Sequence, residues 1–271
     1  MGRKREFDPA EQVEVIIKFI QNYFVENGNP NTKAIIGISG GKDSTIAAAL
    51  LMRALGPDRV VGVMMPNRTQ DDIADSIEVC EILGISHYTF NIGYAYDAMI
   101  NGFNYDVALP MNEQITTNTP ARLRMTALYM VAAAVGGRVC NTGNASERFI
   151  GYTTKYGDLA GDFALFTELT VHEIYAIGDY LGLPEYLVHK APADGMTGKT
   201  DEETTGIPYN VIDDFLLEGK HPEDMKVYEK IMTAHKRNIH KQCINLPKPY
   251  RIGPSLHYND IYDEWAFQRK K

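Results

Sequence analysis

The feature that most constrains the fold of this sequence is a strand, a glycine-bearing turn and a helix in succession near the amino terminus. Residues 33–39 are apolar enough for a short buried strand, and residues 45–55 are rich in alanine and leucine, which favour a helix. The turn between them contains Gly40 and Gly41, which let the backbone approach an anion closely. The free N–H groups at the start of the helix point to the same place. The stretch therefore predicts a phosphate-binding turn.

The polar side chains of this turn narrow the expected ligand to a nucleotide. The hydroxyls of Ser39 and Ser44 can donate hydrogen bonds to phosphate oxygens, and Lys42 adds positive charge. Asp43 is out of place beside an anion unless it holds a cation. The Mg²⁺ that accompanies a nucleotide is such a cation, since it prefers carboxylate oxygens.

Three better-known motifs fit the turn less well. A Walker loop requires glycine at position 36, where this sequence has isoleucine, and serine or threonine after the lysine, where it has Asp43. A dinucleotide fingerprint requires a third glycine at position 42, where this sequence has lysine. The pattern Gly37-x-Ser39-x-Gly41 does satisfy the nucleophile elbow of hydrolases, but the 36 residues before it leave no room for earlier strands and an oxyanion loop. The elbow stays as the runner-up. A turn without any ligand explains neither Lys42 nor Asp43.

The bulk properties predict a single domain over residues 1–271. With 271 residues, 44% of them apolar and 23% charged, the chain resembles an ordinary globular protein. It lacks the run of about 20 apolar residues that spans a bilayer and an export signal, so we expect a cytoplasmic protein. Three widely spaced cysteines argue against a disulfide framework or a zinc site, and the net charge of −8 disfavours a nucleic-acid partner.

The rest of the chain alternates strands and helices. This alternation predicts an α/β fold, a parallel twisted sheet with helices on both faces. A long helix at 112–135 is expected to be entered through Thr119-Pro120, which places Arg122 and Arg124 near its start, an unfavourable end for cations without an anion nearby. The other expected strands are 60–66, 87–92 and 138–142, and the other expected helices are 11–26, 71–83, 168–181, 209–219 and 222–241.

Two stretches lack periodicity. Residues 141–162 are dense in small, polar and charged residues, and a loop of that length is usually functional or disordered; the aromatic residues in it favour the functional interpretation. Residues 190–207 are acidic and rich in glycine and threonine, which is typical of a mobile lid or of a solvated connection.

The turn resembles the Ser-Gly-Gly-x-Asp-Ser loop of N-type ATP pyrophosphatases, which split ATP into AMP and pyrophosphate. Two motifs in the second stretch narrow the resemblance: Thr-Gly-Asn-x-Ser-Glu at 142–147 and Gly-Tyr-x-Thr-Lys-Tyr-Gly-Asp at 151–158. With these motifs the chain is similar to the NAD synthetase family over residues 10–240. The resemblance implies a Rossmann-like sheet of the adenine nucleotide alpha hydrolase type. It also implies an ATP-dependent ligase that converts nicotinic acid adenine dinucleotide (deamido-NAD) and ammonia into NAD.

The resemblance also implies roles for individual residues. From the chemistry of the implied reaction, we expect Lys42 to stabilise the departing pyrophosphate and Asp158 to hold or deprotonate ammonium. Arginine, lysine and histidine suit a substrate that bears a pyrophosphate and a carboxylate. The implied ATP contacts are Gly37, Ile38, Ser39, Gly40, Gly41, Lys42, Asp43, Ser44 and Thr142. The implied Mg²⁺ ligands are Asp43 and Glu147. The implied deamido-NAD contacts are Arg122, Lys155, Asp162, His235 and Lys236.

The sequence departs from the family at two implied ATP contacts. Val171 stands where the family often has lysine, and Ala193 stands where it often has threonine. Lys199, in the expected lid, is a candidate replacement.

Glutamine-using relatives carry an additional amidase domain, for which this chain has no room, so free ammonia is the expected nitrogen donor. A homodimer is also implied. The alternatives are another ATP-pyrophosphatase-type ligase, such as a nucleotide aminase or a tRNA thiolase, and a nucleotide-binding module without turnover.

Overall fold

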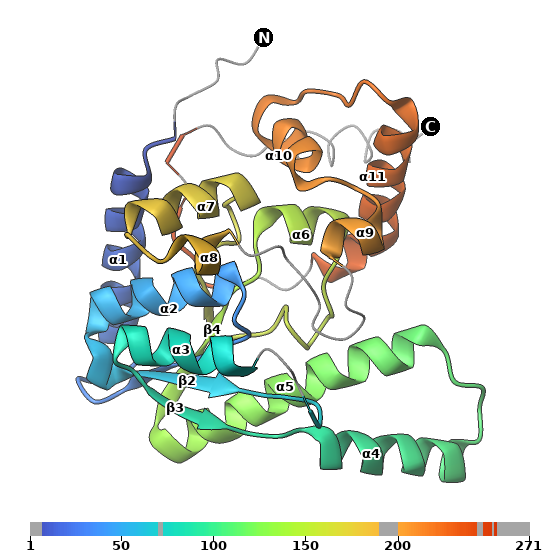
Figure 1. Cartoon of the computed structure of the whole chain (residues 1–271), viewed down its shortest axis with the longest axis horizontal. Helices are drawn as coiled ribbons and strands as arrows, with labels where there is room; N and C mark the ends of the chain where they lie inside the picture. Colours follow the sequence, from blue (N-terminus) through green and yellow to red (C-terminus); the bar gives the residue numbers. More distant parts are fainter. Residues whose placement is uncertain (1–6, 70–72, 190–199, 243–245, 251, 254–271) are drawn as a thin grey trace.

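Five parallel strands form the centre of the computed structural model, which describes residues 7–69, 73–189, 200–242, 246–250 and 252–253. The strands are β1 (Lys33–Gly37), β2 (Val60–Met64), β3 (Ser86–Thr89), β4 (Gly137–Asn141) and β5 (Phe163–Ala164). Their order in the sheet is β3-β2-β1-β4-β5. Because β1 lies between β2 and β4, the strand order reverses beside β1 (Figure 1). Ligands of parallel sheets gather outside the carboxyl ends of the strands at such a switch point.

Five helices lie on one side of the sheet, and the last two of them pack against the first two. They are α1 (Pro9–Glu26), α2 (Lys42–Leu55), α3 (Ile73–Leu83), α7 (Val171–Tyr180) and α8 (Glu185–Val188). Ala34 and Ile36 of β1 point to this face, where they share a core with Ile46 and Leu50 of α2. Asp8 begins α1 by accepting hydrogen bonds from the N–H groups of its first turn. The alternation of strand residues thus divides the apolar side chains between the two faces.

The opposite face packs against α5 (Glu113–Val135), which crosses below the sheet in Figure 1. Ile35 of β1 and Val139 of β4 point this way and meet Met125 and Leu128 of the helix. Helix α4 (Gly93–Gly102) and a π-helical turn, Phe103–Val107, precede α5. Helices on both faces of a parallel sheet confirm the predicted fold class.

A third core joins the helices of the carboxyl-terminal half. These are α6 (Ala145–Ile150), α10 (Tyr209–Glu218) and α11 (Met225–Asn238), with Ile207 from the chain after α9 (Asp201–Thr205). A 3-10 turn at Ile239–Lys241 follows α11. Phe149 of α6 and Phe215 of α10 lie 5.7 Å apart between ring centroids, and Ile231 of α11 is fully buried beside them. This cluster holds α6 in place after β4, and α6 carries one of the predicted metal ligands.

Two expectations about local structure were wrong. Helix α5 begins at Glu113, because Asn112 caps it by accepting the N–H of Ile115 at 3.1 Å, and Pro120 lies inside the helix. Arg122 is therefore remote from the first turn, and the argument from the helix dipole does not apply to it. The second wrong expectation was that residues 141–162 form one long loop, since they contain the helix α6.

None of the helices in the described ranges has the length and apolar character of a membrane-spanning segment.

Candidate active site

The turn between β1 and α2 is held in shape by its own hydroxyl groups. Ser39 Oγ lies 3.2 Å from Ser44 Oγ, and Ser44 Oγ donates to the carbonyl of Gly41 at 3.0 Å. Gly41 is the N-cap of α2 but offers no side chain, so the first N–H groups of the helix keep their capacity to bind an anion. Gly40 adopts a left-handed φ of 74°. The predicted phosphate turn thus lies at the carboxyl end of the central strand.

Replacing Gly40 by alanine should impair both the fold and the turn. A Cβ at this position would lie 3.2 Å from Asp75 Cβ and 3.3 Å from Ser76 Oγ of α3. Gly136 also has a left-handed φ, 69°, with nothing within 4 Å of an added Cβ, so it provides a matched control. We expect Gly136→Ala to cost about 1–2 kcal/mol of unfolding free energy through backbone strain alone. Gly40→Ala should cost more and also weaken ATP binding about tenfold. Unchanged ATP affinity in calorimetry would contradict this role.

Lys42, the first residue of α2, is 2% exposed and lies beside both predicted metal ligands. Its Nζ donates to Asp43 Oδ2 at 2.9 Å and lies 5.7 Å and 5.8 Å from the ring centroids of Tyr175 and Tyr209. Burial alone would lower the pKa of Lys42, but the charges of Asp43 and Glu147 outweigh it and raise the pKa above the ordinary lysine value. The amine is therefore a permanent cation enclosed by aromatic rings.

Asp43 and Glu147 meet because they follow neighbouring strands, β1 and β4. Asn144 lies between them: its backbone N–H donates to Glu147 Oε2 at 3.1 Å, and its side-chain amide contacts Asp43 Oδ1 at 3.5 Å. Surrounding protein atoms and the charge of Asp43 raise the pKa of Glu147 to about 8, although Lys42 acts in the opposite direction. A carboxyl group with a raised pKa beside a second carboxylate is stabilised in its charged form by a bound cation.

These two carboxylates suit Mg²⁺. Magnesium usually takes one or two carboxylates from the protein and completes its shell with water and substrate phosphates. No group of three or more His, Cys, Asp or Glu side chains in the described part of the chain is arranged as a metal site of its own. The donor set therefore fits an ion that arrives with a nucleotide at the adjacent turn.

Asp158 lies in the chain that follows α6. Its Oδ1 accepts the N–H of Thr154 at 2.7 Å, and its carbonyl accepts the side-chain amide of Asn141 at 2.6 Å. The residue keeps much solvent-accessible surface, yet the protein atoms around its carboxyl group raise the pKa of Asp158. Lys241 fastens the same segment by donating to the carbonyls of Gly151 and Thr153 at 2.7 Å and 2.6 Å. The carboxyl group is thus fixed and largely surrounded by protein atoms, although the residue as a whole is exposed.

The residues predicted to bind deamido-NAD divide into three groups. Arg122 and Lys155 lie together, since Arg122 Nε donates to the carbonyl of Lys155 at 3.2 Å. Asp162 uses both carboxylate oxygens within the chain: Oδ2 accepts the N–H of Val139 at 2.7 Å and Oδ1 accepts the hydroxyl of Tyr129 at 3.2 Å. Lys236 is exposed on α11. Thr142, which was predicted to contact ATP, is half-buried directly after β4.

His235 occupies a different environment from the one predicted. It is 2% exposed, its Nδ1 lies 2.8 Å from the carbonyl oxygen of Phe149, and its ring stacks on that phenylalanine at 4.3 Å. Burial lowers the pKa of His235. The structure gives the ring a packing role between α11 and α6, and its contact with a substrate stays a prediction that this geometry does not support.

Sequence reasoning missed the residues that enclose Lys42. Tyr209 begins α10, and its hydroxyl donates to Asp201 Oδ2 of α9 at 3.2 Å. Asp201 itself is 7% exposed, and its charge contributes to the raised pKa of Glu147. Asn144 carried a signal in the sequence, because Asn-x-x-Glu at 144–147 is a capping pattern at a helix start. Nothing in the local sequence indicated the two tyrosines, which come from separate helices.

The expected lid is described in part. Residues 190–199, with Ala193 and Lys199, lie outside the described residues. Thr200 caps α9, and Ile207 joins the third core. Val171 is 1% exposed in that core, so its side chain packs against apolar neighbours.

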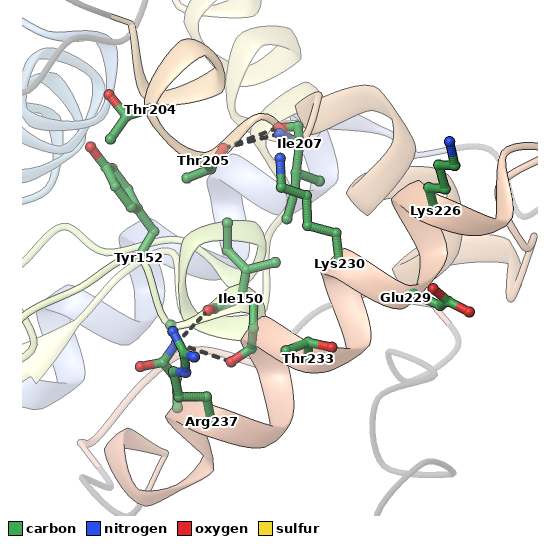
Figure 2. A pocket seen from close by; sticks show the side chains of 13 residues that line it. Ile150, Tyr152, Thr204, Thr205, Ile207, Lys226, Glu229, Lys230, Thr233 and Arg237 are labelled. Atoms are coloured by element: carbon green, nitrogen blue, oxygen red, sulfur yellow. Dashed lines mark hydrogen bonds between the residues drawn. The ribbon is translucent and has the colours of Figure 1, made fainter.

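A cavity of about 630 Å³ lies between α9, α11 and the chain that follows α6. Thr205, Ile207 and Lys230 line one side, and Ile150 and Arg237 lie at the opposite end in Figure 2. The Nζ of Lys230 donates to a backbone carbonyl, that of Gly206, at 3.3 Å. None of the predicted site residues lines this cavity. It is therefore distinct from the cluster around Lys42.

Comparisons with known proteins agree on one family. A family model described as NAD synthase matches residues 12–245. An NH(3)-dependent NAD(+) synthetase of Alkaliphilus metalliredigens is 37% identical over 240 residues, covering 84% of this chain and 96% of the relative. An NMN synthetase structure from Francisella tularensis is 34% identical with a TM-score of 0.79 and covers 89% of this chain and 98% of that one. An NH3-dependent NAD synthetase from Campylobacter jejuni is 27% identical with a TM-score of 0.70, with the same coverage.

Proposed function

The chain belongs to the NAD synthase family, and from this premise we propose that it amidates deamido-NAD with ammonia at the expense of ATP, releasing NAD, AMP and pyrophosphate. The observation that carries the proposal is the meeting of three groups at the carboxyl ends of β1 and β4. Lys42 is a buried cation, and the carboxyl groups of Asp43 and Glu147 lie beside it. A site of this kind can accept a triphosphate together with its metal ion.

Adenylation solves the chemical problem of this amidation. A carboxylate does not react with ammonia in water, because its oxygen is a poor leaving group. In our proposal the nicotinate carboxylate attacks the α-phosphorus of ATP, and pyrophosphate leaves toward Lys42 and the N–H groups at the start of α2. Ammonia then attacks the acyl adenylate, and AMP departs with one oxygen of the original carboxylate. Ser39 and Ser44 act as binding groups, since no covalent enzyme intermediate is needed.

We further propose that Asp43 and Glu147 hold Mg²⁺. When bound, the ion neutralises charge on the triphosphate and polarises the reacting phosphoryl group. The remaining ATP contacts follow the turn from Gly37 to Ser44, with Thr142 on the neighbouring strand. These assignments are supported by the proximity of the turn and the start of α6, which Asn144 links.

Arg122 and Lys155 are the proposed anchors for the pyrophosphate or carboxylate of deamido-NAD. Arg122 Nε donates to the backbone carbonyl of Lys155, and Lys155 Nζ donates to the carbonyl of His240 at 3.2 Å. Arginine and lysine on one stretch of surface suit an anionic ligand of this kind. Asp162 and Lys236 remain proposed substrate contacts. For Asp162, the bonds to Val139 and Tyr129 indicate that its first task is to fix β4 beside α5.

Substitution of Asp158 by asparagine tests the proposed role in ammonium binding. Asparagine keeps an oxygen that can accept the Thr154 N–H, so the local turn should survive. Losing the charge should raise the KM for ammonium about tenfold, because a charged contact is replaced by a neutral one. The KM for ATP should stay constant. Steady-state kinetics over a range of ammonium concentrations decide the matter: an unchanged KM for ammonium removes Asp158 from the mechanism.

A homodimer is proposed from the surface of the α4–α5 region. Large apolar side chains are individually exposed on α4, α5 and the segment between them, namely Tyr94, Met99, Tyr105, Val107, Leu109, Met111 and Met130. Large exposed apolar patches mark interaction sites, and a second copy of the chain is the proposed occupant.

We also propose that the chain acts as one domain in the cytoplasm without a nucleic-acid partner. The third core supplies Tyr209 to the surroundings of Lys42, which supports one functional unit. The free buried thiols of Cys80 and Cys140 suit a reducing compartment, and the net charge of −8 disfavours binding to phosphate backbones.

A second candidate substrate is the mononucleotide. The relevant observation is the likeness to the NMN synthetase of Francisella tularensis, at a TM-score of 0.79. The nicotinate carboxylate is the same in both substrates, so the site around Lys42 serves either one. Discrimination between the two substrates then depends on contacts to the adenylate half, which deamido-NAD has and the mononucleotide lacks.

One assay tests both candidates. The purified chain is mixed with ATP, Mg²⁺ and ammonium, and with either deamido-NAD or nicotinic acid mononucleotide, and the products are separated by chromatography. We expect NAD and AMP in equal amounts from the dinucleotide, at a kcat/KM above that for the mononucleotide. The reverse preference would favour the second candidate, and absence of AMP from both would contradict the proposed function.

A further inference from the structure

A buried aspartate orients an exposed histidine near the proposed nucleotide site. Asp213 of α10 is 2% exposed, and its Oδ2 lies 2.6 Å from Nδ1 of His172, in the first turn of α7. The same oxygen accepts the backbone N–H of His172 at 3.0 Å. Asp213 Oδ1 accepts the hydroxyl of Ser146 at 2.5 Å. The carboxylate is thus fixed from α6 and α7, and it fixes one ring nitrogen of His172.

The other ring nitrogen remains for a ligand. The side chain of His172 is 56% exposed, and within the described part of the chain no hydrogen bond to its Nε2 is present. A histidine whose Nδ1–H is held by a buried carboxylate presents Nε2 in a fixed direction. Because the hydrogen bond to Asp213 already fixes the ring, His172 loses little rotational freedom when its Nε2 binds a ligand.

His172 lies one aromatic ring away from Lys42. Its ring meets that of Tyr175 edge-on, with 6.3 Å between centroids, and the Nζ of Lys42 lies 5.7 Å from the centroid of Tyr175. Tyr175 therefore contacts both groups, the buried amine at the start of α2 and the exposed imidazole at the start of α7. A triphosphate whose inner groups bind at the turn has a terminal phosphate left to bind elsewhere.

We propose that the imidazole of His172, held by Asp213, binds the terminal phosphate of ATP through Nε2. The inference rests on the proposed function, because it assumes that the turn at Gly40 and Lys42 binds the nucleotide. It adds a contact that the sequence motifs do not contain. Lys42 would serve the inner phosphates and His172 the outer one, and the pyrophosphate would be held at two points as it leaves.

The electrostatic surroundings agree with this role. The hydrogen bond to Asp213 raises the pKa of His172, against the effect of partial burial, and the charges of Asp213, Asp214 and Glu202 act in the same direction. A larger fraction of the ring is therefore a cation near neutral pH than for a histidine in water. Imidazolium is a better partner for phosphate than neutral imidazole, since the hydrogen bond is charge-assisted.

A purely structural role makes a different prediction. If the ring only completes the hydrogen bonding of Asp213, removing it disturbs α7 and weakens every nucleotide alike. If it binds the terminal phosphate, the loss is confined to nucleotides that have one. AMP lacks the outer phosphates, so ATP and AMP together separate the two roles.

The experiment measures ATP and AMP dissociation constants by calorimetry, with Mg²⁺, for the whole chain and three variants. His172→Ala should weaken ATP binding about tenfold and leave AMP binding unchanged, because one charged contact is lost. His172→Lys, which keeps a cation, should restore ATP affinity to within about threefold of the parent. His87→Ala, at an exposed histidine of β3, is the control and should match the parent.

Equal weakening of ATP and AMP, or unchanged ATP affinity in His172→Ala, would overturn the inference. If the alanine variant does not fold, His172→Gln replaces it, and the lysine variant must then bind ATP more tightly than the glutamine variant. Turnover of the parent chain is measured in parallel. A parent that makes NAD while His172→Ala keeps its ATP affinity contradicts this inference alone, whereas a parent that makes no AMP contradicts the proposed function.

Discussion

Substitution of Lys42 by methionine is expected to lower kcat about a thousandfold, the largest effect of any single change in this site. The side chain is 2% exposed and its amine forms a 2.9 Å ion pair with Asp43, so solvent has little access to the position of the charge. Without it, the negative charges of Asp43 and Glu147 face the triphosphate with less compensation, and the departing pyrophosphate loses its buried cation. Methionine preserves most of the side-chain volume between Tyr175 and Tyr209.

The measurement is kcat at saturating ATP, deamido-NAD and ammonium, beside the melting temperature. Lys33→Met at the start of β1 is the control, since its amine bonds only to the carbonyl of Asp58 among the contacts that the structure describes. The control should keep parental kcat. A Lys42→Met variant that folds and turns over within about tenfold of the parent would exclude Lys42 from catalysis.

Glutamine in place of Glu147 should lower kcat about a hundredfold or more and raise the Mg²⁺ concentration needed for half-maximal rate. The side chain has two tasks in the structure. Its Oε2 accepts the N–H of Asn144 at 3.1 Å and so completes a capping box at the start of α6, and its charge faces Asp43. Glutamine fulfils the first task, because it also completes such boxes, but it is a weak ligand for Mg²⁺.

The chain contains a matched control for this substitution. Glu173 completes the same capping box at the start of α7, where its Oε2 accepts the N–H of Thr170 at 3.0 Å. Glu173→Gln should therefore have the same small effect on stability as Glu147→Gln but no effect on the Mg²⁺ dependence. If both variants lose activity equally, the loss comes from the helix caps, and Glu147 is not a metal ligand.

The centre of the fold and of the site could be predicted from the sequence because both depend on short-range signals. A buried strand followed by Gly40 and Gly41 indicates a turn at the carboxyl end of β1 wherever the rest of the chain goes. The resemblance of the motifs pairs Asp43 with Glu147, and the parallel strands β1 and β4, which precede them, are neighbours that end at the same edge of the sheet. The predicted family is confirmed by the family model and the relatives, and the fold class by the parallel sheet.

The features that the sequence did not indicate depend on contacts between distant segments. Pro120 normally signals a helix boundary, but Asn112 caps α5 earlier and the packing of Leu128 under the sheet retains the helix through the proline. Tyr175 and Tyr209 surround Lys42 only after α7 and α10 pack together. The stacking of His235 is a third example: the family resemblance assigns this residue to the substrate, and the local sequence does not indicate that its ring stacks on Phe149.

The central claim is that the turn at β1 binds ATP so that a carboxylate can be activated as its AMP ester. Isotope transfer tests it most directly. Deamido-NAD with both oxygens of its nicotinate carboxylate replaced by oxygen-18 is turned over with unlabelled ATP, Mg²⁺ and ammonium, and the nucleotides are analysed by mass spectrometry. Each AMP formed is expected to carry one labelled oxygen. Unlabelled AMP, or ADP in place of AMP, would contradict this claim.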